Sequence, residues 1–263
     1  MEWLGYIASV LIGVSLGLIG SGGSILTVPV LVYLFHKDAL LATTYSLCIV
    51  GVSSIAGVIS RLRQKLLDYR VILVYGIPSI LGVFISRKFI LNAIPLKFTV
   101  LSNFPISRNN FIMLFFAILM LAAALSMIFG KNRTANEGQQ PVYGFPLSFF
   151  GFLEGLVTGI VGAGGGFLII PALVLLGKLP MKKAIASSLF IIMIKSLVGF
   201  GGDLLHNVPV EWKFLSVMII LATLGIITGN YLNKTMDGAK LKKGFGWFVL
   251  LMSLVILFEQ VFA

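Results

Sequence analysis

Long apolar stretches separated by short polar ones run through the whole chain. A helix needs about 20 mostly apolar residues to span a bilayer, and such stretches lie at 39–60, 70–86, 110–130, 184–202, 214–232 and 245–261. Two longer apolar runs, 3–35 and 145–177, are interrupted by glycines. The pattern predicts a set of plain membrane helices and two unusual, interrupted segments.

Composition supports the same class. Of the 263 residues, 58% are hydrophobic and 11% are charged, and the mean hydropathy is +1.05. A water-soluble fold cannot bury so much apolar surface. We therefore expect an all-α, multi-pass membrane protein. The first apolar run lacks a basic leading region and an A-x-A-like cleavage site, so we expect it to be retained.

The formal net charge of +11 does not change this class. Lys and Arg gather in short loops between apolar runs, where positive residues orient a membrane protein. No nucleic acid is expected as a partner. Cys48 is the single cysteine, which excludes an intrachain disulfide and a thiolate metal cluster. We expect no cofactor and no metal.

The chain contains an internal repeat. One register places Gly13, Gly17, Gly20, Gly22, Gly23, Pro29 and Leu31 on Gly155, Gly159, Gly162, Gly164, Gly165, Pro171 and Leu173. The same register continues through Ser46/Ser188 and Gly57/Gly199. The first copy later carries extra residues near 99–108. We predict a first membrane repeat at 1–130, a polar loop at 131–143 and a second repeat at 144–263, together one membrane domain.

Each copy opens with a cluster of glycines inside its interrupted run, Gly20-Ser21-Gly22-Gly23-Ser24 and Gly162-Ala163-Gly164-Gly165-Gly166. Each Gly costs about 1 kcal/mol against Ala inside a helix, and Pro29 or Pro171 follows. As one helix, 3–35 would be about 50 Å long, against a hydrocarbon core of about 30 Å. The segment therefore bends sharply or turns back as a re-entrant hairpin.

Irregular backbone is tolerated in a membrane only where it is packed inside protein or lines a wet cavity. The helices that restart near Ser24 and Gly166 would direct free N–H groups into such a cavity, which suits an anion. Two such helix ends facing each other are typical of transporters. By contrast, the Gly13/Gly17 and Gly155/Gly159 spacing predicts close helix contacts, a structural role.

Polar residues inside the apolar runs are further candidates. Lys195 lies near the middle of 184–202, and an intramembrane ionisable residue indicates function. It could bind the anion or pair with Glu154, either at the site or in a packing role; Glu154 is also a candidate for proton coupling. Ser53 replaces Lys195 in the first copy. Hydroxyl donors that suit an oxyanion, unless they bond their own backbone, are Thr43, Thr44, Ser46, Ser187 and Ser188.

Loop charges bear on topology. Arg61, Arg63, Lys65 and Arg70 are predicted to lie between two spans, and Asp203, His206, Glu211 and Lys213 fill the matching loop of the second copy. Such contrast suits inverted repeats. If each interrupted run is a re-entrant hairpin, the repeats are inverted; if each crosses, there are eight spans and the repeats are parallel. We favour the inverted arrangement, which brings the two glycine breaks together from opposite faces.

Two copies of G-x-x-x-G-x-x-G-x-G-G-x(5)-P-x-L, each followed by an Ala/Ser-rich helix, resemble the TauE/SafE family of sulfite exporters, also called toluene sulfonate uptake permeases. The resemblance covers nearly the whole chain and implies a permease for sulfite, thiosulfate or organosulfonates in the cytoplasmic (inner) membrane. The chain departs from the repeated pattern at Ser24, opposite Gly166, and in the extra residues near 99–108. Candidate further partners are protons, as the coupling ion, and a second copy of the chain, in a homodimer.

The sequence also bears on two other functions, an enzyme and a channel. Gly13-Val14-Ser15-Leu16-Gly17 matches G-x-S-x-G, but a nucleophile elbow needs a strand-to-helix turn, and this motif lies in a predicted membrane helix. The histidines, His36 and His206, fall in predicted loops. The chain is therefore not expected to be an enzyme. A passive anion channel remains an alternative, because the same glycine-lined site could conduct.

Overall fold

The computed structural model describes residues 2–262 except 21–22, 94, 96, 101–103, 130–141, 163, 206–207 and 233–237. Helices dominate the described part, which confirms the α-helical expectation. The first segment is a hairpin: α1 (Glu2–Ile19) ends at Gly20, and α2 (Ser24–Pro29) continues into the π-helical η1 (Val30–Leu34). The Phe35 ring then packs edge-on against Tyr6, with centroids 5.3 Å apart. The two ends of the segment therefore lie together.

The rest of the first half consists of longer helices. They are α3 (Ala39–Arg63), a continuous stretch made of α4 (Tyr69–Val71), η2 (Ile72–Gly76), α5 (Ile77–Ile85), η3 (Ser86–Ile90) and α6 (Leu91–Ala93), and finally α7 (Arg108–Phe129). The extra residues of the first copy form an antiparallel hairpin, β1 (Lys97–Val100) with β2 (Phe104–Ser107). This hairpin is the exception to the all-α expectation.

The second half repeats this order without the strands. It contains α8 (Phe145–Val161), α9 (Gly166–Leu175), α10 (Met181–Leu205), α11 (Trp212–Leu232) and α12 (Gly238–Phe262). Its broken segment is also a hairpin, since Val142 N–H donates to the Gly177 carbonyl at 3.0 Å, which joins its two ends. His36 and Lys178 follow the two hairpins and both adopt a left-handed conformation, at φ 51° and 52°.

Among the described residues, five helices are long and apolar enough to cross a membrane: 39–63, 69–90, 108–129, 181–205 and 212–232. Shorter apolar helices occupy 3–19, 24–34, 145–161, 166–175 and 246–260. Many large apolar side chains point outward, including Trp3, Leu205 and Tyr231. An outward apolar surface on long helices is what lipid requires, so the chain is a multi-pass membrane protein.

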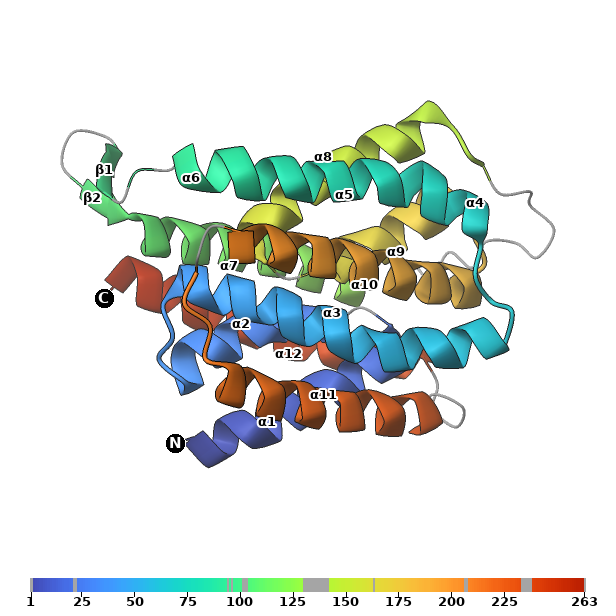
Figure 1. The fold of residues 1–263 in the computed structure, drawn as a ribbon, viewed down its shortest axis with the longest axis horizontal. Helices are drawn as coiled ribbons and strands as arrows, with labels where there is room; N and C mark the ends of the chain where they lie inside the picture. The colour runs from blue at the N-terminus through green and yellow to red at the C-terminus, as the bar shows by residue number, and fades with distance from the viewer. Residues whose placement is uncertain are drawn as a thin grey trace.

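Matching helices of the two halves run in opposite directions. In Figure 1 the colour gradient of α3 proceeds from left to right and that of α10 from right to left, and α7 and α12 differ in the same way. The halves are interleaved, because α1 packs on α11 while α8 packs on α5, and α3 packs on α10. Opposed directions of matching helices are what an inverted repeat requires.

Glycine contacts between the halves come in reciprocal pairs. A Cβ atom at Gly82 of α5 would collide with the Phe152 carbonyl and approach Gly155 of α8. At Gly225 of α11 it would collide with the Val10 carbonyl and approach Gly13 of α1. Small residues let helix backbones approach closely in a membrane, and these four glycines lie at such close contacts. A two-fold axis between the halves would produce this reciprocity.

Two residues predicted to lie in loops are instead buried in helices. Arg61 belongs to α3 and is 8% exposed, and Asp203 belongs to α10 and is 6% exposed. Both helices continue beyond their apolar stretches, because each charged side chain finds hydrogen-bond partners inside the protein. Arg63 and Lys65 lie at the exposed end of α3, as expected.

Candidate functional site

A buried ion pair lies beside the second glycine break. Lys195 Nζ of α10 donates to Glu154 Oε1 of α8 at 2.5 Å, and the two side chains are 1% and 0% exposed. Charged groups leave water only at a large cost in free energy, which their mutual attraction offsets when the geometry is good. The sequence left open whether Lys195 pairs with Glu154, and the structure brings the two together.

Gly165 lies directly against this pair. It has φ +71° and precedes the first residue of α9, and a Cβ atom there would collide with Glu154 Oε1 and lie 2.6 Å from Lys195 Nζ. Both the backbone conformation and the space therefore require glycine. The first N–H groups of a helix have no intrahelical acceptor. The Glu154 carboxylate is thus held between a lysine and the start of α9.

Hydroxyl groups surround the ion pair. Ser79 of α5 donates to Glu154 Oε2 at 2.8 Å, and Lys195 Nζ donates to Thr158 Oγ1 at 3.3 Å. Tyr75 is fully buried, and its hydroxyl is close enough to Glu154 to interact electrostatically, although no described residue hydrogen-bonds it. Both oxygens of Glu154 are therefore hydrogen-bonded, one by Lys195 of α10 and the other by Ser79 of α5.

The corresponding place beside the first break is apolar. A Cβ atom at Gly23, the counterpart of Gly165, would collide with the Ile12 carbonyl and lie 2.9 Å from Leu16 Cγ. Ile12 and Leu16 occupy the repeat positions of Glu154 and Thr158. Ser53, at the position of Lys195, donates to its own backbone at Ile49. The asymmetry expected from Ser53 therefore extends to the counterparts of Glu154 and Thr158.

The two breaks contact the Ala/Ser-rich helices of the opposite halves. A Cβ atom at Gly20 would collide with Ile185 of α10, and one at Gly162 would collide with Thr43 of α3. Gly164 lies near Ser196, with 3.3 Å from its virtual Cβ to Oγ. In addition, α2 contacts α9. Ser21, Gly22 and Ala163, also predicted at the site, lie outside the described residues.

The predicted hydroxyl residues are spread over several surroundings. Thr43 and Ser188 donate to backbone carbonyls one turn earlier, Leu40 and Ile185. Ser46 is buried, with no hydrogen-bond partner among the described residues. Ser187 accepts from the Asp68 N–H at 3.0 Å. These residues do not gather around Lys195.

Asp68 joins three segments near Ser187. Its carboxylate caps α4 by accepting from the Val71 N–H at 3.1 Å, and it also accepts from the Tyr143 hydroxyl at 3.0 Å. Burial, and then the Asp68 carboxylate, raise the pKa of Tyr143 above its ordinary value. Tyr143 therefore keeps its proton and remains a donor. Asp68 caps α4, which Figure 1 shows at the end of the molecule opposite the two chain termini.

Sequence reasoning missed a second buried ion pair. Arg87 of η3 donates through Nη1 to Asp203 Oδ2 at 2.8 Å, and the side chains are 3% and 8% exposed. Thr44 also donates to Asp203 Oδ2, at 2.7 Å, so this predicted site residue belongs here. Arg87 lies just past the apolar stretch 70–86. The available signal was that no turn residue separates Arg87 from that stretch, so the helix could continue through it.

Metal binding has no support in the described ranges, where no group of three His, Cys, Asp or Glu side chains gathers. Cys48 is buried in α3. The arrangement around Lys195 can instead hold one negative charge, through an ammonium group, hydroxyl donors and a helix start. That charge is supplied by Glu154 in this conformation.

Comparisons with known proteins agree with the membrane assignment. The chain matches the family described as Sulfite exporter TauE/SafE over residues 6–256. It is 25% identical to the Probable membrane transporter protein YunE of Bacillus subtilis (strain 168), over 99% of this chain and 100% of that protein. A Probable membrane transporter protein of Xylella fastidiosa (strain Temecula1 / ATCC 700964) is 27% identical, over 95% and 92%.

A further relative, a Probable membrane transporter protein of Haemophilus influenzae, is 25% identical over 93% of each chain. No solved structure matches the chain. The family match extends from α1 into α12 and so includes both glycine breaks and both buried ion pairs. The chain belongs to the TauE/SafE family and is a multi-pass membrane transporter of that type.

Proposed function

We propose that this protein is a secondary transporter that moves a small sulfur-containing anion, such as sulfite, thiosulfate or an organosulfonate, across the cytoplasmic membrane. The substrate would be held where the glycine breaks approach each other, next to Lys195. The observation that carries the proposal is the contact of Gly165 with the Lys195–Glu154 pair. A buried cation beside an unwound helix start suits an anion.

Glu154 would act as an internal substitute for the substrate. Its carboxylate faces Lys195 and the start of α9, the same groups that would bind an external anion. Two anions cannot share one buried cation at low cost, because like charges repel strongly where water is excluded. Substrate binding would therefore require that Glu154 lose its charge or move away.

Protonation of Glu154 is the simplest way to remove that charge. The substrate anion would then pair with Lys195, and the neutral carboxyl group would still donate or accept a hydrogen bond at Ser79. One proton and one monovalent anion would cross together, without net charge. This makes Glu154 a coupling residue and Lys195 a substrate-binding residue.

The repeat arrangement supports alternating access. We infer an inverted repeat, because matching helices run in opposite directions and cross-half contacts are reciprocal. In such transporters the two halves rock around a central site. The Lys195–Glu154 pair is sealed from solvent in this conformation, so the anion would enter in another conformation.

The decisive experiment is uptake of labelled sulfite into proteoliposomes, with and without a pH gradient. Thiosulfate, an aryl sulfonate, sulfate and chloride serve as competitors. Saturable uptake blocked by sulfur oxyanions but not by chloride is expected. Counterflow, in which unlabelled sulfite inside accelerates entry of label, separates a carrier from a passive channel.

Variants tie this flux to the site. Lys195→Met should abolish sulfite uptake, whereas Lys213→Met, an exposed lysine of α11, should leave it unchanged. Equal flux in wild type and Lys195→Met would refute the assignment of Lys195. Flux without saturation or counterflow would instead indicate the channel alternative.

A further inference from the structure

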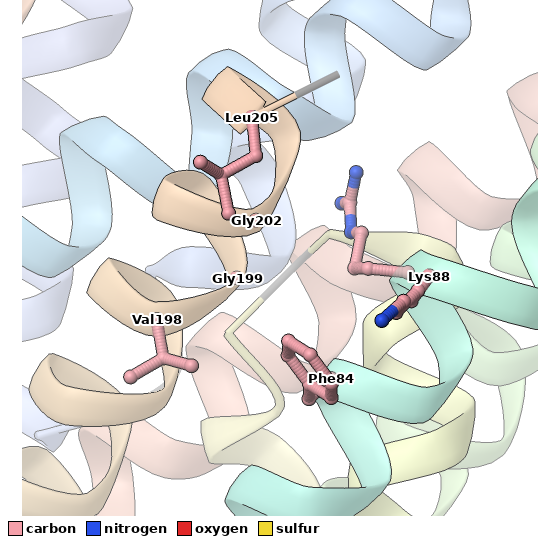
Figure 2. A pocket seen from close by; sticks show the side chains of 7 residues that line it. Phe84, Lys88, Val198, Gly199, Gly202 and Leu205 are labelled. Carbon is pink, nitrogen blue, oxygen red and sulfur yellow. The ribbon is translucent and has the colours of Figure 1, made fainter.

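A cavity of about 220 Å³ lies between η3 and α10, away from the Lys195–Glu154 pair. Its apolar walls are Phe84, Val198 and Leu205, and two glycines of α10, Gly199 and Gly202, widen it. Figure 2 shows Phe84 and Lys88 on one side and Val198 and Leu205 on the other. Phe84, Val198 and Leu205 are 39%, 36% and 80% exposed, so the cavity opens to the outer surface.

Arg87 gives this cavity a polar end. The residue is 3% exposed and is one of those that line the cavity. Only Nη1 is used by Asp203; Nε and Nη2 are buried and have no hydrogen-bond partner among the described residues. A buried donor without a partner costs about 1–3 kcal/mol. An arginine left with two such donors indicates an acceptor that is supplied from outside.

The geometry of the guanidinium identifies the kind of acceptor. Nε–H and Nη2–H point in parallel along one edge of the group, and this edge matches two oxygens of a carboxylate, sulfonate or phosphate. The remaining nitrogen, Nη1, donates to Asp203 Oδ2, and the same oxygen accepts a hydrogen bond from Thr44. The free edge is therefore fixed in direction before any ligand binds.

A second basic residue, Lys88, also lines the cavity. Its Nζ lies 5.5 Å from the ring centroids of both Phe84 and Phe89, which keeps it near the cavity wall.

The backbone is adapted to the same position. Arg87 belongs to η3, a π-helical turn within an otherwise α-helical stretch, and such turns occur often at functional sites. On the facing helix, a Cβ atom at Gly202 would meet no atom within 4 Å. The space opposite Arg87 is therefore real volume that no side chain of the described residues fills.

This cavity is distinct from the proposed transport site. Asp203 lies eight residues after Lys195 on α10, which is about 12 Å along a helix axis. Between them, Gly199 packs on Leu47 and Val83, at 3.0 and 3.1 Å from its virtual Cβ. A ligand at Arg87 would thus lie nearer one end of the membrane helices than the Lys195–Glu154 pair.

We propose that the Arg87 cavity is a second binding site, for an amphipathic oxyanion. The oxyanion head would accept hydrogen bonds from Nε and Nη2 of Arg87, and its apolar body would lie against Phe84, Val198 and Leu205. An aryl or alkyl sulfonate from water has this chemistry, and so does an anionic phospholipid from the bilayer, since the cavity is open at the outer surface.

Binding to purified wild-type protein in detergent tests the proposal without transport. The probes are benzenesulfonate, sulfate and dihexanoyl phosphatidylglycerol, with the shift of the thermal unfolding temperature as readout. Benzenesulfonate or the phospholipid should raise the unfolding temperature, and sulfate, which lacks the apolar body, should do so much less. The probe that binds identifies the source of the natural ligand.

Three variants locate the site. Arg87→Lys keeps a cation for Asp203 but loses the two parallel donors, so affinity should fall about tenfold or more. Gly202→Leu should fill the cavity and abolish the shift. Gly201→Leu is the matched control: it is the neighbouring glycine, a Cβ there also meets nothing within 4 Å, and it does not line the cavity.

The outcomes are distinct. The site is established if Gly202→Leu and Arg87→Lys weaken binding while Gly201→Leu does not, and Gly202→Leu decides alone if Arg87→Lys does not fold. Binding that is equal in Gly202→Leu and wild type would overturn it, as would no shift with either amphipathic probe. In Lys195→Met, the amphipathic probe should still raise the unfolding temperature. The binding test of the Arg87 cavity is therefore independent of whether the transport proposal is correct.

Discussion

Lys195 Nζ lies 2.5 Å from Glu154 Oε1, and neither side chain exceeds 1% exposure. The two charges neutralise each other on helices α10 and α8, which are packed beside the second glycine break. Because neither group has access to water, a change in the charge of one must be compensated by a change in the charge of the other or by a charged ligand. The pair therefore links the charge of Glu154 to stability and, under the proposed function, to substrate binding.

The first prediction concerns stability. Lys195→Met or Glu154→Gln alone leaves one partner buried without the other, which costs about 3–5 kcal/mol. The double variant should recover much of this loss, because no unpaired charge remains. Thermal unfolding of the purified single and double variants measures the difference. Additive losses in the double variant would show that the two residues do not depend on each other.

The second prediction concerns the glycine break. Gly165→Leu should abolish sulfite uptake while the protein remains inserted, because the new side chain would occupy the place of Glu154 Oε1 and force φ +71° on a branched residue. Gly22→Leu should act in the same way at the first break. Gly244→Leu in α12, where a Cβ meets nothing within 4 Å, is the control. Normal uptake in both break variants would remove these loops from the site.

The third prediction concerns pH. If a proton on Glu154 admits the substrate, sulfite should bind wild type more tightly as pH falls. Glu154→Gln imitates the protonated carboxyl group, so sulfite binding to this variant should not depend on protonation at residue 154. In this variant, counterflow should persist, whereas accumulation driven by a pH gradient should disappear. Binding and gradient-driven uptake, measured at several pH values in buffers of matched ionic strength, check both. A Glu154→Gln variant that still accumulates sulfite with the gradient would exclude Glu154 as the coupling residue.

The fourth prediction concerns topology. Cysteines are introduced one at a time into a Cys48→Ser background. Those that replace Trp3 and His36 should react with an impermeant thiol reagent from one side of the membrane, and those that replace Val142 and Lys178 from the other. This pattern follows if each broken segment is a hairpin with both ends on one face. Reaction of Trp3 and His36 from opposite sides would instead support eight crossings and parallel repeats.

Much of the fold was predictable from the sequence because its signals are local. The apolar lengths of 39–60 and 184–202 identify α3 and α10, and clustered glycines at 20–23 and 162–166 mark the breaks. The extra residues near 99–108 correspond to the β1–β2 hairpin. Each of these features depends on residues that are neighbours in the chain.

The candidate site was predictable only in part, because its chemistry depends on helices that are distant in sequence. Lys195 and Glu154 stood out as charges in apolar runs, and the structure brings them together. Arg87 and Asp203 did not, because each lies where an apolar stretch ends, and only the packing of η3 against α10 shows that they are buried. Ser187 looks equivalent to Ser188 in the sequence, yet its hydroxyl oxygen accepts a hydrogen bond from the Asp68 N–H.

The apolar counterpart of the Lys195 cluster has a consequence for kinetics. With Ile12, Leu16 and Ser53 at the matching positions, one half of the molecule carries all of the charge at the centre. If the substrate binds beside Lys195, as we propose, one anion moves per turnover, with a Hill coefficient of one for each chain. The two halves then cannot exchange roles, so the affinities measured from the two sides of the membrane should differ even though helices follow in the same order in both halves.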